Sequence, residues 1–222
     1  MLFSFFSLLI SDTEEIYTQV FDDLAQKWVG RPFSLEIKAK MMGRPRADAL
    51  AQYKELLEIP LSVEEIDVQT RSHLNELMPQ ADFMPGARRL VEHLHKHQIP
   101  MAIATGSDKQ SFAIKTGRNQ SFFDTYFSHV VLSCDPEVKS GKPAPDIFMV
   151  AAQRFTQLPT DTSKCVVFED APLGVQGAIA AGMKCVWVPT VPIESYENLV
   201  DKAHMLQSLE HFQPEHFGLP PF

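Results

Sequence analysis

The sequence predicts an α/β protein that has a parallel β-sheet core, helices on both faces of the sheet and an inserted all-helical unit. Beyond residue 98, short apolar blocks alternate with stretches of helical spacing, a pattern typical of parallel sheets with right-handed crossovers. Residues 15–80 instead combine helical periodicity with an absence of strand-like blocks. We therefore expect a core of residues 1–14 and 81–222 and a helical unit of residues 15–80.

The first strand is expected within the apolar run Met1–Ile10, MLFSFFSLLI. This run is shorter than the about 20 residues that span a bilayer. It also lacks the basic start and the small-residue cleavage site of a signal peptide. A buried strand of a parallel sheet has the same appearance, so we favour the strand and expect a soluble, cytoplasmic protein.

The later elements follow in alternation along the chain. Strands are expected at Ile99–Ala104, His129–Ser133, Lys164–Phe168 and Lys184–Val188. Helices are expected at Gly86–His97, Lys109–Thr116, Asp146–Phe155 and Pro172–Ala181. The tail Gln207–Phe222 has few charges and three prolines, and we expect it to pack as an irregular strap.

The amino-acid composition excludes some classes of protein and of partner. The 222 residues include 45% hydrophobic and 22% charged side chains, which argues against disorder. Lysine and arginine total 20 against 28 acids, for a formal net charge of -8. We expect no nucleic-acid partner, because sequence-independent binding to nucleic acid needs a basic surface. No membrane partner is expected either, and the chain is expected to be a monomer. The three cysteines, Cys134, Cys165 and Cys185, are expected to be buried thiols of a reducing compartment.

Polar residues follow three of the expected strands. Thr105-Gly106-Ser107-Asp108 follows the first of them, Cys134-Asp135 the next and Glu169-Asp170 the third, while Ser140-Gly141-Lys142-Pro143 precedes a helix. Ligands of parallel sheets bind outside the carboxyl ends of the strands, so these groups should meet at one edge. A hydroxyl, free amides and a lysine suit phosphate, and paired carboxylates suit Mg²⁺. Phosphate together with magnesium suggests phosphoryl chemistry.

Each of these residues also has a purely structural interpretation. Thr105 could be a helix N-cap, Lys142 a surface charge and Glu169-Asp170 an acidic pair at a helix start. Their joint placement at one edge favours the functional interpretation. In the helical unit, Arg44 is a candidate contact for a substrate anion, although a solvated turn is the default.

The motifs resemble those of haloacid-dehalogenase-like phosphatases with a helical cap inserted after the first strand. The matching segments are Asp12-Thr13-Glu14, Met84-Pro85-Gly86, Ala104-Thr105-Gly106-Ser107, Gly141-Lys142-Pro143, Asp146-Ile147-Phe148, Phe168-Glu169-Asp170 and Ala181-Gly182-Met183. The tail, with Phe212-Gln213-Pro214-Glu215 and Phe217-Gly218-Leu219-Pro220, looks like that of the pseudouridine-5'-phosphatase branch. The resemblance runs from about residue 9 to the end.

This resemblance implies a Rossmann-like core and a magnesium-dependent phosphomonoesterase lineage. Its substrate would be a small nucleoside or sugar phosphate, with pseudouridine 5'-phosphate first among the candidates. By the resemblance, Thr105 and Lys142 would be the catalytic residues that bind and neutralise the phosphoryl group. Gly106, Ser107 and Arg44 would bind substrate, and Asp170 with Glu169 would hold Mg²⁺. The cap would close over the substrate and select it.

The chain departs from the family at its start. The family's Asp-x-Asp-Gly carries the nucleophile and the general acid-base, and this chain contains no Asp-x-Asp. Counting back from Asp12 without a gap puts Phe5, Ser7 and Leu8 in those places. A phenyl ring cannot attack phosphorus and a serine hydroxyl is a poor proton acceptor, so we expect an inactive or nearly inactive chain.

Three hypotheses follow. The chain could belong to a magnesium-dependent phosphatase whose first segment is altered by a different first exon or a misassigned start. This hypothesis rests on the observation that only the opening residues depart from the family's motifs. It could be a non-catalytic binder of phosphorylated metabolites. It could also be an unstable by-product, since Ser4, Ser7 and Ser11 interrupt an apolar strand.

Overall fold

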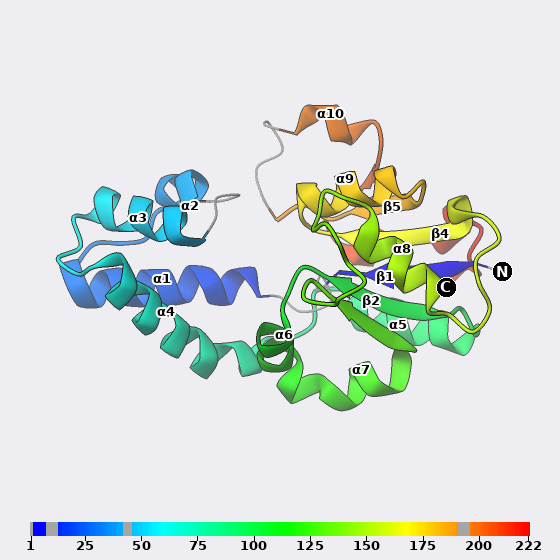
Figure 1. The fold of residues 1–222 in the computed structure, drawn as a ribbon, viewed down its shortest axis with the longest axis horizontal. Coiled ribbons are helices and arrows are strands. Elements are labelled where there is room, and N and C mark those ends of the chain that lie inside the picture. The colour runs from blue at the N-terminus through cyan, green and yellow to red at the C-terminus, as the bar shows by residue number, and fades with distance from the viewer. Residues whose placement is uncertain (1, 8–12, 42–45, 191–195) are drawn as a thin grey trace. The chain divides into compact units, whose positions relative to one another are not determined.

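The computed structural model describes residues 2–7, 13–41, 46–190 and 196–222, and it divides the chain into two compact units. One unit comprises residues 1–11 and 82–222, and the other comprises residues 12–81. The chain is coloured by residue number in Figure 1, which labels the helices and strands of both units. The first unit contains the sheet, and the second is helical over its described residues.

A six-stranded parallel sheet forms the centre of the first unit, in the order β3-β2-β1-β4-β5-β6. The strands are β1 (Phe3–Phe6), β2 (Met101–Thr105), β3 (His129–Leu132), β4 (Cys165–Glu169), β5 (Lys184–Trp187) and β6 (His204–Met205). Because β1 lies between β2 and β4, the residues that follow these three strands are neighbours in space. The expected α/β fold and five of its strands are confirmed, whereas the two-residue β6 was not expected.

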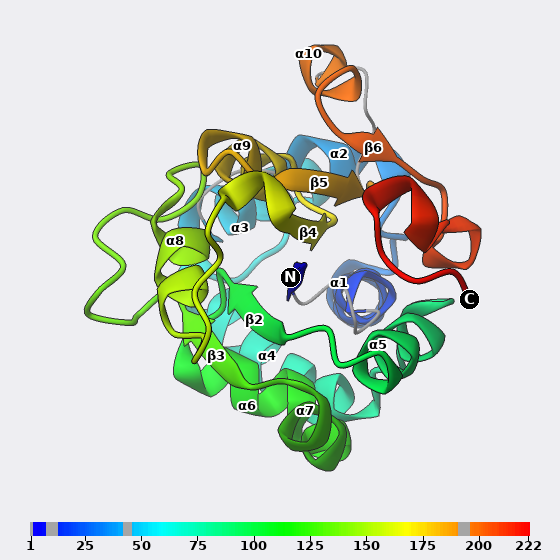
Figure 2. The same ribbon diagram turned by 90° about the vertical axis from the view of Figure 1, so that its right-hand side faces the viewer.

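Helices cover both faces of this sheet, as Figure 2 shows for α8 and α9 on one face and α5 on the other. The bounds are α5 (Ala87–Lys96), α6 (Lys109–Thr116), α7 (Gln120–Tyr126), α8 (Asp146–Gln153), α9 (Pro172–Ala180) and α10 (Glu197–Val200). On one face, side chains of α8 and α9 pack against Phe3, Phe5 and Val167. On the other, α5, α7 and the tail pack against Phe6 and Phe168. Burial of these apolar surfaces is the main source of the core's stability.

The second unit contains α1 (Glu14–Val29), α2 (Leu35–Met41), α3 (Arg46–Leu57) and α4 (Val63–Leu77), followed by a 3-10 turn at Met78–Gln80. Gly30 ends α1 in a left-handed conformation with φ 64°, which favours glycine. Ser62 and Glu65 form a reciprocal capping box at the start of α4. The buried Tyr53 lies at the centre of this unit's core, where its hydroxyl donates to the Phe21 carbonyl.

The tail packs through two 3-10 turns, at Leu209–His211 and Pro214–Phe217, which bury Phe212 and Phe217 against the sheet. This agrees with the expected irregular strap. The expectation for the cysteines was wrong in one case. Cys165 and Cys185 are buried in strands, but Cys134 is exposed because it lies in the turn after β3.

Candidate functional site

A buried ion pair links Lys142 to the end of β4. The Lys142 ammonium lies 2.5 Å from Oε1 of Glu169 and donates a second hydrogen bond, of 3.1 Å, to the Ala104 carbonyl in β2. The Lys142 side chain is only 13% exposed and that of Glu169 only 1%. The lysine is therefore held between two strands of the sheet by an acceptor from each.

The environment of Glu169 explains why it faces the lysine. Its second oxygen accepts hydrogen bonds from the amides of Asp170 and Ala171, at 3.1 and 3.2 Å. Burial raises the pKa of the Glu169 carboxyl, and the Lys142 ammonium opposes that shift. Gly174 leaves room for the carboxylate, because a Cβ there would lie 2.0 Å from Oε1 of Glu169.

Ser7 joins this edge from β1. Its amide donates to the Phe168 carbonyl at 3.1 Å, and its hydroxyl donates to Oδ1 of Asp170 at 3.1 Å. The Trp187 indole donates to the Asp170 carbonyl at 2.9 Å and so anchors this turn. The first residue beyond β1 therefore lies against the carboxylate that follows β4.

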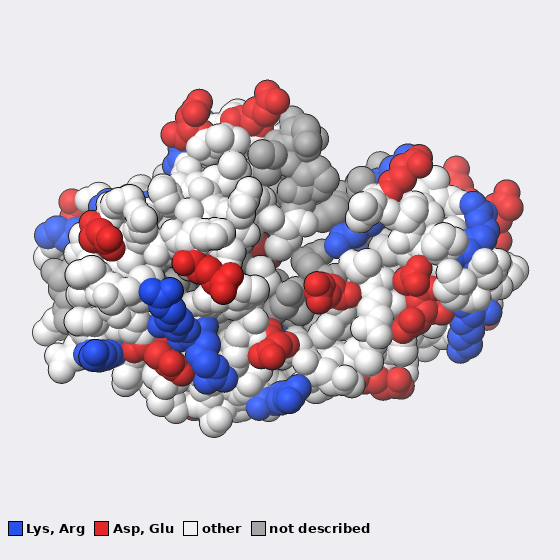
Figure 3. All heavy atoms as spheres, turned by 180° about the vertical axis from the view of Figure 1, so that it is seen from behind, with Lys and Arg blue, Asp and Glu red and all other residues white. Residues whose placement is uncertain are grey.

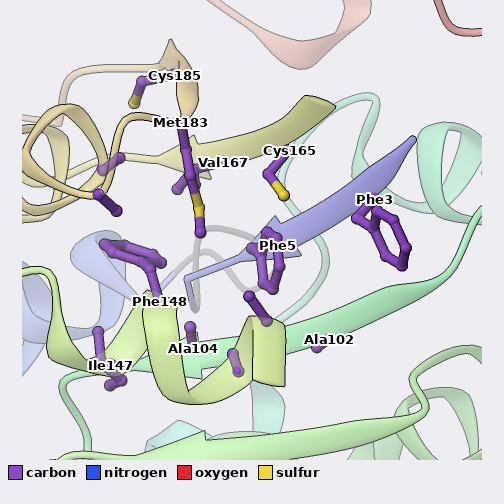
Figure 4. Close-up of a cluster of buried hydrophobic side chains, with 14 of the residues drawn as sticks. Phe3, Phe5, Ala102, Ala104, Ile147, Phe148, Cys165, Val167, Met183 and Cys185 are labelled. Atoms are coloured by element: carbon purple, nitrogen blue, oxygen red, sulfur yellow. The ribbon is translucent and has the colours of Figure 1, made fainter. Parts of the chain in front are cut away.

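The register of β1 determines where the residues of the ungapped count from Asp12 lie. That count puts Phe5 in the place of the nucleophile, and Phe5 pairs with Val167 in the middle of the sheet and is fully buried. Its ring packs against Phe155 with centroids 5.5 Å apart, and Figure 4 shows Phe5 within the apolar cluster. Hydrophobic packing holds Phe5 away from the edge, and Ser7, the first residue beyond β1, reaches the site.

Thr105 ends β2 at the same edge, where its buried hydroxyl accepts a hydrogen bond of 3.1 Å from the Ser107 amide. No atom lies within 4 Å of the position that a Cβ would take on Gly106 or Gly141. The turns that carry these glycines therefore border open space on the first unit. A hydroxyl, an ammonium group and backbone amides near such a space can bind a phosphate group.

The structural alternatives for these residues do not hold. Asp108, rather than Thr105, is the N-cap of α6, since its carboxylate accepts from the Ser111 amide. Lys142 is a buried partner of Glu169 and not a surface charge. Helix α9 begins at Pro172 with Ala171 as its N-cap, so Glu169 lies in the strand before it.

Two of the expected site segments lie outside the described residues. They are Arg44, the candidate contact for a substrate anion, and Asp12, the start of the Asp-Thr-Glu motif. The neighbouring Arg46 is described, and its guanidinium pairs with Asp67 and donates to the Thr70 hydroxyl. Arg46 therefore stabilises the helical unit by joining α3 to α4.

The expected magnesium ligands fit a metal centre poorly. Oε1 of Glu169 faces Lys142 and Oε2 accepts two amides, so both oxygens of this carboxylate already have partners within the protein. Asp170 is then the one carboxylate of the pair that is turned toward Ser7. Among the described residues, no three His, Cys, Asp or Glu side chains form a group that could hold a metal ion.

The sequence matches a known family over most of its length. The profile described as "Haloacid dehalogenase-like hydrolase" matches residues 6–188. The chain belongs to this family of hydrolases. The match begins at the last residue of β1 and ends just after β5, so it includes the ends of the strands that form the site.

Among relatives of this haloacid dehalogenase-like hydrolase, (DL)-glycerol-3-phosphatase 2 of Arabidopsis thaliana is 43% identical over 96% of the chain and 89% of its own length. The probable pseudouridine-5'-phosphatase of Drosophila melanogaster is 42% identical, over 96% and 91%. A solved structure, described as a putative beta-phosphoglucomutase from Thermotoga maritima, has a TM-score of 0.77 and 26% identity, and covers 95% of each chain. The resemblance inferred from the motifs is thus confirmed.

The surface of the hydrolase carries charges of both signs. On the face shown in Figure 3, basic and acidic side chains are interspersed, in keeping with the excess of acids in the sequence. Over the described part of the chain, no helix combines the length and the apolar character needed to cross a membrane.

Proposed function

We propose that this chain binds small phosphorylated metabolites at the edge formed by Ser7, Thr105, Lys142 and Asp170, and that it turns them over very slowly. The observation that carries the proposal is the hydrogen bond between Ser7 and Asp170. A hydroxyl stands where β1 reaches the site, and loss of a nucleophilic group costs on the order of a thousandfold or more in rate.

Each group of this edge has a role in the proposal. Thr105, whose hydroxyl oxygen accepts from the Ser107 amide, and the amide of Gly106 bind phosphate oxygens, and Lys142 neutralises their charge. Glu169 acts through Lys142 as a positioning residue, because it fixes the ammonium between β2 and β4. Asp170 orients the Ser7 hydroxyl, which donates to its Oδ1.

The substrate class follows from the relatives. One is described as a glycerol-3-phosphatase and another as a probable pseudouridine-5'-phosphatase, so we propose a small phosphomonoester, with pseudouridine 5'-phosphate first. In this proposal the helical unit is the cap that selects among such compounds, and Arg44 contributes to that choice.

Binding and turnover are tested separately. Calorimetry with pseudouridine 5'-phosphate, glycerol 3-phosphate and inorganic phosphate, each with and without Mg²⁺, should show binding that Lys142→Ala weakens by at least tenfold. Absence of binding at millimolar ligand would falsify the proposal. The same compounds serve as substrates in a phosphate-release assay, where the unmodified chain should show negligible turnover.

The structure also indicates which variant should restore activity. In this proposal Ser7→Asp supplies a carboxylate just beyond β1, so it should gain turnover over the unmodified chain. Ser4→Ala, in the same strand, is the matched control and should gain none. Rapid turnover by the unmodified chain, unaffected by Lys142→Ala, would show that the chemistry takes place elsewhere.

A further inference from the structure

We propose that Ser7 is itself a phosphorylation site: its hydroxyl accepts a phosphoryl group from small acyl phosphates, and the phosphoserine that forms persists. The inference rests on the proposed function, since it uses the same phosphate-binding edge. It goes further by assigning to this chain a slow self-modification in place of the turnover of its relatives.

The contact between Ser7 and Asp170 supplies the reacting pair. The hydroxyl donates to the carboxylate at 3.1 Å, within reach for transfer of its proton. A hydroxyl oriented on a base is the usual arrangement of an activated oxygen nucleophile. The Ser7 amide is fixed on the Phe168 carbonyl, and the Asp170 carbonyl is fixed by the Trp187 indole. Both partners are therefore held by the backbone of the sheet.

The neighbouring groups can hold a phosphoryl donor against Ser7. The strands β2 and β4 flank β1, and Lys142 is bonded to both, so its ammonium lies at the same end of the sheet as the hydroxyl. Thr105 adds a hydroxyl from β2, and open space borders Gly106 and Gly141. An ammonium close to the transferring group stabilises the negative charge of the transition state.

The step balances without a redox partner. The Ser7 oxygen attacks phosphorus and forms an O–P bond, while the bond between phosphorus and the acyl oxygen breaks. The hydroxyl proton passes to Asp170 and from there to water, and the acyl group leaves as a carboxylate anion. Acyl phosphates are the donor class, because a carboxylate leaves readily and a single Asp is a weak base.

The product should be long-lived for two reasons. A phosphoserine is an alkyl ester, so its leaving group is a far stronger base than the carboxylate released from the donor. In addition, the chain has no Asp-x-Asp, the motif that supplies the family's acid-base group.

Incubation of the full chain with acetyl phosphate, followed by intact-mass and peptide mass spectrometry, tests the inference. We expect one phosphoryl group per chain, located on Ser7 and resistant to hydroxylamine, which cleaves acyl phosphates but not phosphoserine. Ser7→Ala should lose the modification. Asp170→Asn should slow it at least tenfold, because the hydroxyl then lacks its base.

Ser4→Ala is the matched control, since Ser4 lies in the same strand, is fully buried and its hydroxyl has no hydrogen-bond partner. The Ser4→Ala variant should be phosphorylated to the same extent as the chain without substitutions. Modification that survives Ser7→Ala, or that hydroxylamine removes, would overturn the inference. The inference would also be overturned if Ser7 remained unphosphorylated while the binding of inorganic phosphate still depended on Lys142. That result would leave the proposed function intact. Loss of phosphate binding itself would instead contradict the proposed function.

Discussion

Lys142 and Glu169 form an almost completely buried ion pair that joins the loop before α8 to the end of β4. Their side chains are 13% and 1% exposed, and the carboxylate is also bonded to two backbone amides. Charges removed from water to this extent stabilise a fold only when they remain paired. Changes to either partner, or to the space around them, should therefore have large effects.

Glu169→Gln should lower the free energy of unfolding by about 3 kcal/mol, because it leaves the Lys142 ammonium buried without a counter-charge. Urea denaturation at neutral pH measures the change. Glu92→Gln, at an exposed pair with Arg88, is the control and should cost less than about 1 kcal/mol. The double variant Glu169→Gln/Lys142→Met should recover part of the loss, and a double variant as unstable as the single one would contradict the pairing argument.

Gly174→Ala should lower the free energy of unfolding by about 2 kcal/mol, because its Cβ would collide with the buried Glu169 carboxylate. Gly117→Ala is the matched control. No atom lies within 4 Å of its added Cβ, so the change should be below about 1 kcal/mol. Thermal or urea melts compare the two substitutions. Equal losses of stability would show that the space beside the Glu169 carboxylate does accommodate a Cβ at position 174.

Phe5→Asp should prevent folding or cost at least about 4 kcal/mol, because it removes a ring from the core and buries a carboxylate there. Ser7→Asp should cost less than Phe5→Asp, because Ser7 follows the strand and lies outside the apolar core, and its main cost is a carboxylate facing that of Asp170. Circular dichroism and urea titration distinguish the two variants. A stable Phe5→Asp protein that gains phosphatase activity would support Phe5 as the position of the family's nucleophile and would contradict the register of β1.

His129 should make stability depend on pH. Burial lowers the pKa of its imidazole below the usual 6.5, and its Nε2 lies 2.8 Å from the Ala151 carbonyl. Between the folded pKa and about 6.5, the unfolded chain binds more protons at this residue than the folded chain does. The contribution of His129 to the free energy of unfolding therefore rises with pH through that window and is complete above about pH 7.

Urea titrations from pH 5 to pH 7.5 check this direction. The His129→Gln variant should show a smaller rise in stability over the interval than the unmodified chain. The exposed His97 offers a control, and His97→Gln should leave the rise unchanged. A steeper rise in His129→Gln than in the unmodified chain would mean that the sign assigned to His129 is wrong.

Much of the fold could be predicted from local pattern. Apolar blocks such as Lys164–Phe168 and Lys184–Val188 are buried strands of the sheet, and the helix over Lys109–Thr116 has the expected bounds. That Thr105 and Glu169-Asp170 lie at one edge of the sheet could be predicted, because parallel strands bring their carboxyl ends together. The two-residue β6 was missed, since it carries too few residues for any periodicity.

The roles of the individual site residues were harder to predict from the sequence. A Glu-Asp pair in a sequence suggests two equivalent metal ligands, yet the structure turns Glu169 to Lys142 and Asp170 to Ser7. The difference arises from burial: the fully enclosed Glu169 needs a counter-charge, and that partner lies 27 residues away.

The sequence by itself determined that this is an α/β hydrolase of a phosphatase-rich family and that it lacks the family's Asp-x-Asp. Only the tertiary structure decided where the residues of the first strand lie. The pairing of β1 with β4, more than 150 residues away, buries Phe5 and brings Ser7 to Asp170. Strand register depends on distant hydrogen bonds and on packing against helices, and no local pattern encodes either.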